Sequence, residues 1–176
     1  SELLTLEQGK VLAESSKEIL YGESFIDWFA CIIKSSSTYI RPGNSYEHKL
    51  IAEKEPIGPV AAITPWNFPC AMVVRKIVPA IAAGCSVILK PSELTPFSAL
   101  AQAMLLEEAG LPAGVLNVVT SDAKLFGDII CKDFRIRKLS FYRLNKGREV
   151  VVRKISKLIK EALAGVGWKC SIYCIC

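Results

Sequence analysis

The chain has 176 residues, the length of one domain or of a piece of a larger one, and 51% of them are hydrophobic, which suffices for a buried core. Its seven cysteines are scattered, and an odd count without a secretory leader argues against a disulfide framework. The longest uncharged stretch, 56–74, contains four prolines, so we expect a soluble protein without a membrane helix.

Positive charge is concentrated in one window of the chain. Residues 131–160 hold eleven Lys or Arg against two acids, which leaves the rest of the chain negative although the net charge is +5. A nucleic-acid or anionic-membrane surface is one interpretation. Two other interpretations are a solvated helix face at 153–160 and an altered reading frame, and the sequence favours these. No nucleic-acid or membrane partner is therefore predicted.

The first 34 residues show apolar spacing typical of helices, with a break at Gly9. Residues 35–49 are rich in serine and contain Pro42-Gly43, which predicts a loop or hairpin.

Strands and helices then alternate. The expected strands are 60–63, 86–89, 115–119 and 138–141, and the expected helices are 70–83, 96–110 and 123–131. Gly84 suits a left-handed helix end, and Thr95 suits an N-cap before Pro96. Unbroken apolar strands separated by helices predict an α/β fold, a partial doubly wound (Rossmann-like) parallel sheet preceded by N-terminal helices. Such sheets bind ligands at the carboxyl ends of their strands.

Two polar turns follow the first two predicted strands. The first reads Thr64-Pro65-Trp66-Asn67-Phe68-Pro69, and the second reads Lys90-Pro91-Ser92-Glu93. Together they resemble the cofactor domain of aldehyde dehydrogenases, most closely the succinate-semialdehyde dehydrogenase branch. Further similar segments lie at 5–10, 25–30, 112–119 and 137–141. The resemblance covers about residues 1–141.

The resemblance implies a role for each turn. Asn67 corresponds to the amide that donates to the oxyanion of the reacting aldehyde, and a fixed neutral donor suits developing negative charge. Thr64, Pro65 and Trp66 would lie near the nicotinamide. Lys90 and Glu93, with Ser92 between them, would bind the adenosine ribose. A carboxylate accepts from a 2′-hydroxyl and repels a 2′-phosphate, so we expect NAD rather than NADP.

Arg75 and its neighbours on the following helix are assigned by the same resemblance. Arg75 would contact the distal carboxylate of the aldehyde substrate, which suits a bidentate guanidinium. Lys76 is expected to be a surface charge. Cys70 stands at a helix start, where the family often has Ser or Ala, and is not expected to be the nucleophile.

The resemblance breaks after Phe141. The family continues Thr-Gly-Ser-Thr-x-x-Gly and, about twenty residues later, Glu-Leu-Gly-Gly with its general base; this chain has neither. A reading frame shifted by one base can encode both motifs, at 142–149 and at 163–176, while 153–161 is similar to the family in the original frame. We therefore expect three parts: 1–55, an N-terminal helical segment and loop; 56–141, the NAD-binding βαβ region; and 142–176, an aberrant tail partly out of frame.

The tail also contains three of the cysteines, Cys170, Cys174 and Cys176, and the only histidine, His48, is remote from them. No metal site is predicted.

By resemblance, the function is NAD-dependent oxidation of succinate semialdehyde to succinate, as in 4-aminobutyrate degradation. The nucleophilic Cys and the general-base Glu are expected to be missing, which predicts an inactive chain. Three alternatives stay open: a non-catalytic nucleotide-binding fragment, a basic nucleic-acid-binding module, and a different aldehyde dehydrogenase subfamily. The family is homo-oligomeric, although assembly of this chain is not implied. The sequence leaves the compartment open between cytoplasm and mitochondrion.

Overall fold

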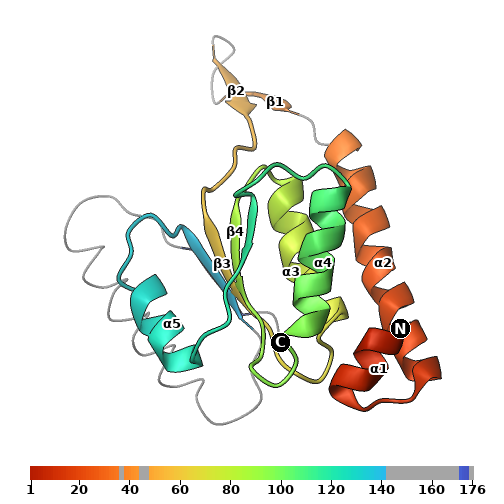
Figure 1. Ribbon diagram of the computed structural model, residues 1–176. Coiled ribbons are helices and arrows are strands. Elements are labelled where there is room, and N and C mark those ends of the chain that lie inside the picture. The colour runs from red at the N-terminus through yellow and green to blue at the C-terminus, as the bar shows by residue number, and fades with distance from the viewer. Residues whose placement is uncertain (36–37, 44–47, 142–170, 175–176) are drawn as a thin grey trace.

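The computed structural model describes residues 1–35, 38–43, 48–141 and 171–174 of the chain (Figure 1). The helices there are α1 (Glu2–Gln8), α2 (Leu12–Ser35), α3 (Ala71–Ala82), α4 (Phe97–Glu108) and α5 (Ala123–Ile130). The strands are β1 (Tyr39–Pro42), β2 (Lys49–Ala52), β3 (Val60–Ile63), β4 (Val87–Lys90), β5 (Leu116–Val118), β6 (Lys138–Phe141) and β7 (Ser171–Cys174). None of the helices formed by the described residues has the length and apolarity that a membrane span requires.

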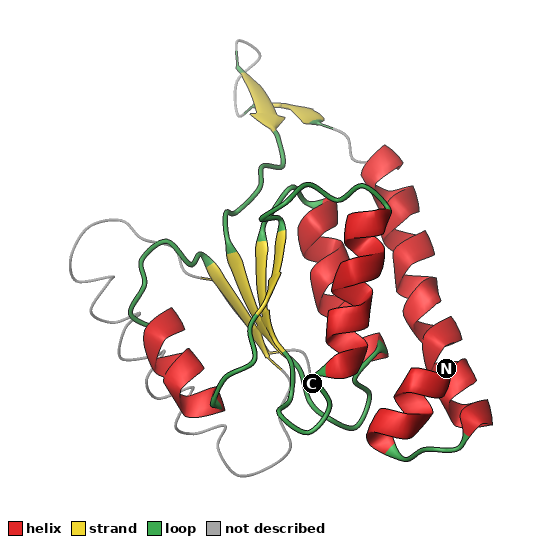
Figure 2. Cartoon of the chain, viewed as in Figure 1, coloured by secondary structure: helices red, strands yellow, loops and turns green. Residues whose placement is uncertain are grey.

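The centre of the fold is a parallel sheet with the strand order β5-β4-β3-β6-β7. Helices α3 and α4 cover one face, and α5 covers the other (Figure 2). Strands β1 and β2 form a separate antiparallel hairpin that projects from this body. The predicted α/β class with a doubly wound parallel sheet is therefore confirmed.

Each face of the sheet has its own apolar core, because successive side chains of a strand point to opposite faces. On the α5 side the core consists of Ala61, Phe126, Ile130, Leu139 and Phe141. On the α3 and α4 side it consists of Ala62, Val73, Ile77, Val87, Leu89 and Ala99. Adjacent residues Ala61 and Ala62 divide between the two cores, which explains why β3 shows no polar alternation.

The predicted strands match the observed ones to within one residue at the start of each, and the serine-rich segment forms the hairpin. Strand β7 is the exception, because no strand was predicted in the tail. It pairs in parallel with β6, with Ser171 opposite Lys138. Since β7 covers that side of β6, the sheet has one strand more than the four predicted.

Gly84 adopts the left-handed conformation just after the end of α3, as predicted. Its φ is +76°, and its amide donates to the carbonyl of Ile81 at 2.9 Å. A Cβ at this position would lie 3.0 Å from Cγ of Pro56 and would also strain the backbone. Glycine is therefore required where the chain turns from α3 into β4.

The start of α4 is capped from another part of the chain, and the predicted Thr95 cap is wrong. The carboxylate of Glu7, on α1, accepts from the backbone amides of Phe97 and Ser98 and from the Ser98 hydroxyl. The Thr95 hydroxyl is buried and has no hydrogen-bond partner among the described residues. A carboxylate at a helix N-terminus also interacts favourably with the helix dipole, so Glu7 ties α1 to α4.

Candidate active site

The two polar turns lie next to each other at the carboxyl edge of the sheet. Strands β3 and β4 are neighbours in register, with Ile63 opposite Lys90. The amide of Thr64 donates to the carbonyl of Lys90 at 3.1 Å, which joins the first residue of one turn to the first of the other. The two turns are therefore close enough for one ligand to contact both, as the sequence led us to expect.

Lys90 and Glu93 form an ion pair within the second turn. The Lys90 side chain is 2% exposed and that of Glu93 is 55% exposed, so the pair runs from the interior to the surface. Burial by itself raises the pKa of the Glu93 carboxyl, but the hydrogen bond and charge of Lys90 outweigh it, and the net pKa lies below the usual value. Glu93 is thus an ionised acceptor held at the edge of the sheet. The Ser92 hydroxyl accepts from the Leu94 amide at 3.3 Å, which stabilises the same turn.

The first turn holds polar atoms that the described residues do not satisfy. The hydroxyl of Thr64 and the side-chain oxygen of Asn67 are both buried without a hydrogen-bond partner there. Pro65 is half-buried, and Trp66 is 46% exposed. A buried polar atom without a partner costs free energy unless a ligand or water satisfies it. The turn therefore offers hydrogen-bonding capacity at the position where parallel sheets bind ligands.

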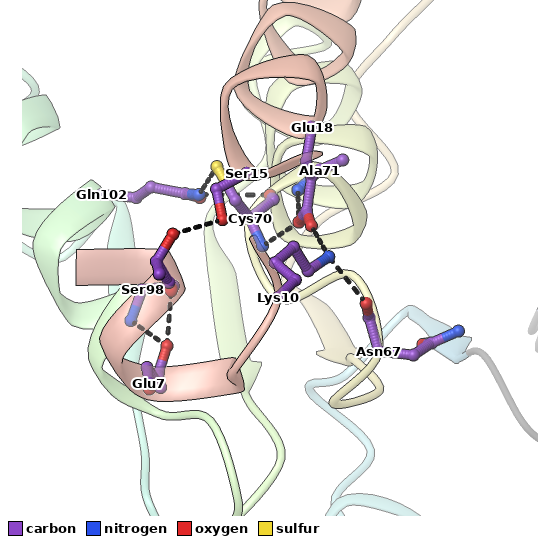
Figure 3. Close-up of polar contacts among 10 residues, drawn as sticks. Glu7, Lys10, Ser15, Glu18, Asn67, Cys70, Ala71, Ser98 and Gln102 are labelled. Carbon is purple, nitrogen blue, oxygen red and sulfur yellow. Dashed lines mark hydrogen bonds and ion pairs between the residues drawn. The ribbon is translucent and has the colours of Figure 1, made fainter. Parts of the chain in front are cut away.

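The residues that support this turn are not apparent from the sequence. Glu18, on α2, is 3% exposed and accepts from the amides of Cys70 and Ala71 at 2.8 and 3.0 Å. Lys10 pairs with Glu18 and donates to the carbonyl of Asn67 at 3.1 Å (Figure 3). Lys10 and Glu18 are each more than fifty residues before the turn residues that they bind, so local sequence patterns carry no signal for these contacts.

Arg75 and Lys76 lie next to each other on α3 and have different environments. Arg75 is half-buried, and its guanidinium carbon lies 5.5 Å from the centre of the Phe25 ring on α2. The expectation that Lys76 is a surface charge is wrong, because it is 5% exposed and donates to the Ser140 hydroxyl on β6 at 2.8 Å. The helix turns Lys76 toward the sheet and Arg75 toward α2.

Cys70, at the start of α3, is not suited to attack a substrate. It is 8% exposed, and Gln102 contacts its sulfur at 2.8 Å. Burial, and next the negative charge of Glu18, raise the pKa of its thiol from 9.0 to about 11. A nucleophilic cysteine needs a lowered pKa and access to the substrate, and Cys70 has neither.

The other described cysteines do not form a site with Cys70. Cys31 is exposed on α2, Cys85 is buried before β4, and Cys131 is half-buried after α5. No group of three or more His, Cys, Asp or Glu residues suited to a metal ion occurs within the described ranges. The side chains of the three tail cysteines lie outside those ranges.

An open cleft of about 450 Å³ lies at the opposite edge of the sheet. Its lining comes from the segments that enter the strands, and includes Gly58, Cys85, Ser86, Pro112 and Val115. It is largely apolar and contains none of the predicted site residues. The carboxyl edge is therefore the better candidate.

Comparison with known proteins identifies the family to which this fold and these turns correspond. The model of the aldehyde dehydrogenase family matches residues 1–170. The match extends beyond residue 141, where the recognisable motifs end, so the resemblance is longer than the sequence analysis predicted.

Individual relatives agree with this match. A succinate-semialdehyde dehydrogenase [NADP(+)] of Escherichia coli (strain K12) is 48% identical over 167 residues, which are 95% of this chain and 35% of that protein. A glutarate-semialdehyde dehydrogenase of Pseudomonas putida is 46% identical over 167 residues, which are again 95% of this chain and 35% of that protein. The crystal structure of succinate-semialdehyde dehydrogenase from Burkholderia pseudomallei superposes with a TM-score of 0.85 at 47% identity, covering 89% of this chain and 33% of that one. The chain thus spans about a third of the length of the relatives it matches.

The environment of Cys70 predicts slow alkylation. At pH 8 a thiol of pKa about 11 is ionised to about one part in a thousand, roughly a hundredfold less than a thiol of pKa 9.0. In the folded chain, iodoacetamide should label the exposed Cys31 at least about tenfold faster than Cys70, which is both buried and less readily ionised. Peptide mass spectrometry over a time course measures both rates, and a urea-unfolded sample is the control. Comparable rates in the folded state would contradict this account of Cys70.

Proposed function

The chain belongs to the aldehyde dehydrogenase family, and we propose that it carries the cofactor-binding side of an NAD-dependent oxidation of succinate semialdehyde to succinate. Enzymes of this family use NAD or NADP. The observation that supports the proposal is the adjacency of the two turns, joined by the hydrogen bond from Thr64 to Lys90. It brings candidate ribose-binding groups and a candidate oxyanion donor to one edge of one sheet. On this proposal, residues 56–141 are the nucleotide-binding region.

Lys90 and Glu93 are proposed to bind the hydroxyls of the adenosine ribose, with Ser92 shaping the turn between them. Their ion pair pre-forms the arrangement, and the lowered pKa of Glu93 keeps its carboxylate ionised. A carboxylate accepts from a 2′-hydroxyl and repels a 2′-phosphate, which favours NAD. The E. coli relative is named for NADP, so this preference is a property proposed for Glu93 and not for the whole family.

At the other turn, the bound NAD supplies the hydride acceptor, and the residues of this chain orient the aldehyde beside it. Thr64, Pro65 and Trp66 are proposed to line the nicotinamide position. The Asn67 amide is proposed to donate to the aldehyde oxygen as negative charge develops on it. A donor that is already in place stabilises this charge without reorganisation, which is the usual source of oxyanion stabilisation.

Arg75 is proposed to bind the distal carboxylate of the substrate. The named relatives include dehydrogenases for succinate and glutarate semialdehydes, which both carry such a group. The Phe25 ring beside the guanidinium restricts Arg75, so less conformational freedom is lost when it pairs with a carboxylate.

The nucleophile and the general base are proposed to be missing from these 176 residues because the reading frame changes around 142–149 and 163–176. The family match to residue 170 fits a tail that retains family sequence in part. The test is to sequence the genomic DNA and transcript from the Phe141 codon past the Cys176 codon. One uninterrupted frame encoding Thr-Gly-Ser-Thr, Glu-Leu-Gly-Gly and a later cysteine is expected. Codons that match the present tail in both sources, with a stop after the Cys176 codon, would instead mean that the locus yields a truncated relative without the nucleophile, and the catalytic part of the proposal would be withdrawn.

A second candidate is a nucleotide-binding protein without catalysis. The raised pKa of Cys70 favours it, because this cysteine, three residues after Asn67, is poorly ionised and buried. NAD binding by the chain without NADH production from succinate semialdehyde would support this candidate.

Glu93 provides a test of cofactor preference. In Glu93→Gln the repulsion of a 2′-phosphate and one charge-assisted hydrogen bond are lost, so NAD should bind about tenfold more weakly and NADP more tightly than to the unsubstituted chain. Isothermal titration calorimetry measures both dissociation constants. Glu108→Gln, at the exposed end of α4, is the matched control and should change neither. An unchanged NAD-to-NADP ratio in Glu93→Gln would exclude Glu93 as the selecting residue.

Arg75 provides a test of the substrate. A chimaera joining residues 1–141 to the remainder of the E. coli relative supplies the missing catalytic groups. Arg75→Met in it should raise KM for succinate semialdehyde at least about tenfold, because a charge-assisted pair is lost, and should leave butyraldehyde, which lacks the carboxylate, unaffected. Steady-state NADH production gives both values, with Lys17→Met, an exposed cation on α2, as control. Equal effects on the two aldehydes would show that Arg75 does not recognise the carboxylate.

A further inference from the structure

The start of α3 is satisfied by a buried ion pair that comes from the N-terminal helices. The first amides of a helix have no partner within it, and the N-cap residue here, Cys70, makes no side-chain cap. One oxygen of Glu18 accepts from the amides of Cys70 and Ala71 at 2.8 and 3.0 Å. The other oxygen pairs with Lys10. The Lys10 and Glu18 side chains are 10% and 1% exposed, so solvent screens their interaction only slightly.

The same ion pair also holds the residues that precede the helix. The Lys10 ammonium donates to the Asn67 carbonyl at 3.1 Å and lies 4.5 Å from the centre of the Phe68 ring. Asn67 is thus held directly through its own carbonyl. The chain just after it is held through the amides of Cys70 and Ala71, which donate to Glu18. Figure 3 shows the Asn67 side-chain amide pointing away from Lys10, so the backbone is held while the amide remains available.

A donor on a turn needs such support. Catalytic groups must be held to within about 0.5 Å of the productive geometry, and turns position side chains less accurately than helices or strands do. Asn67 lies beyond the last residue of β3 and before the first of α3. Its position therefore depends on contacts from outside the turn, and the side chains of Lys10 and Glu18 provide those at Asn67 and just after it.

We propose that Lys10 and Glu18 are positioning residues for the Asn67 amide. This inference rests on the proposed oxyanion role of Asn67. The pair fixes the backbone at Asn67 and just after it, so its loss would let the amide move although every residue of the turn is still present. The pair acts through Asn67 and does not itself contact the substrate.

Glu7 provides a matched comparison. It is a carboxylate from the same N-terminal segment, and it caps α4 in the way that Glu18 caps α3. It does not contact the turn that carries Asn67. Suppose that Lys10 and Glu18 only stabilised the fold. Removing the Glu7 charge should then change the mobility of the turn at Trp66 and Asn67 as much as removing the charges of Lys10 and Glu18 does.

Trp66, next to Asn67 and 46% exposed, reports on this turn. The other two tryptophans, Trp28 and Trp168, are replaced by Phe so that Trp66 is the only tryptophan, and it is excited at a wavelength that tyrosine does not absorb. In this background we compare Lys10→Met/Glu18→Gln with Glu7→Gln. The double variant is chosen because removing one partner alone leaves an unpaired buried charge and can unfold the chain. Lys10→Met and Glu18→Gln singly serve as additional variants if they fold.

The double variant should lower the fluorescence anisotropy of Trp66 and increase its quenching by acrylamide, while a cooperative urea transition persists. Amide exchange at Cys70 and Ala71 should rise about ten- to a hundredfold, as expected from the loss of charge-assisted hydrogen bonds. Glu7→Gln should leave Trp66 unchanged and raise exchange at Phe97 and Ser98 instead. Unchanged Trp66 signals in the double variant, or equal changes in both variants, would overturn the proposal.

These readouts require neither nucleotide nor turnover, so they separate this inference from the proposed function. If the unsubstituted chain fails to bind NAD, the proposed function fails and the role of Lys10 and Glu18 is still measured. In the chimaera, the double variant should lower kcat for succinate semialdehyde at least about tenfold and leave the affinity for AMP unchanged, because AMP needs only Lys90 and Glu93. A weaker AMP affinity with an unchanged kcat would contradict the assignment to Asn67.

Discussion

The first backbone amides of α3 and α4 have no partner within their own helices, and the described structure depends on satisfying them from elsewhere in the chain. Each helix follows directly from one of the two candidate site turns, and neither has a side-chain cap of its own. A buried helix end without partners is costly, and here carboxylates from α1 and α2 satisfy both ends. Glu7 serves α4 and Glu18 serves α3. The N-terminal helices are therefore part of the same structural unit as the two turns and not an appendage to it.

This arrangement also limits where a nucleotide can lie. Helix N-termini in α/β folds commonly bind phosphate, because the amides and the helix dipole attract anions. At α3 and α4 this capacity is used by the protein's own carboxylates, which would repel a phosphate. Recognition at this edge of the sheet would therefore depend on side chains of the turns, and Lys90 with Glu93 is the charged pair suited to it. A ribose, whose groups are hydroxyls, fits such a pair better than a phosphate does.

The sequence predicted what local patterns determine and missed what distant residues determine. Strands β3 and β6 were predicted to the residue, because apolar runs bounded by turns need no distant partner to be recognised. The left-handed Gly84 was predicted for the same reason. Lys76 was predicted to be an ordinary surface charge of a helix, whereas in the fold it is buried and donates to Ser140, sixty-four residues later. The Thr95 cap was equally plausible locally, but Glu7 occupies that helix end. For the site, the two turns could be predicted, whereas their supports, Lys10 and Glu18, could not.

A dinucleotide is proposed to bind across the two turns at the carboxyl edge of the sheet. Titration of the ¹⁵N-labelled chain with NAD, followed by amide chemical shifts, is the decisive experiment. Saturable shifts should be concentrated at residues 64–68 and 90–93. Shifts confined to the cleft at the opposite edge, around Gly58 and Cys85, or no shifts at millimolar NAD, would contradict this proposal.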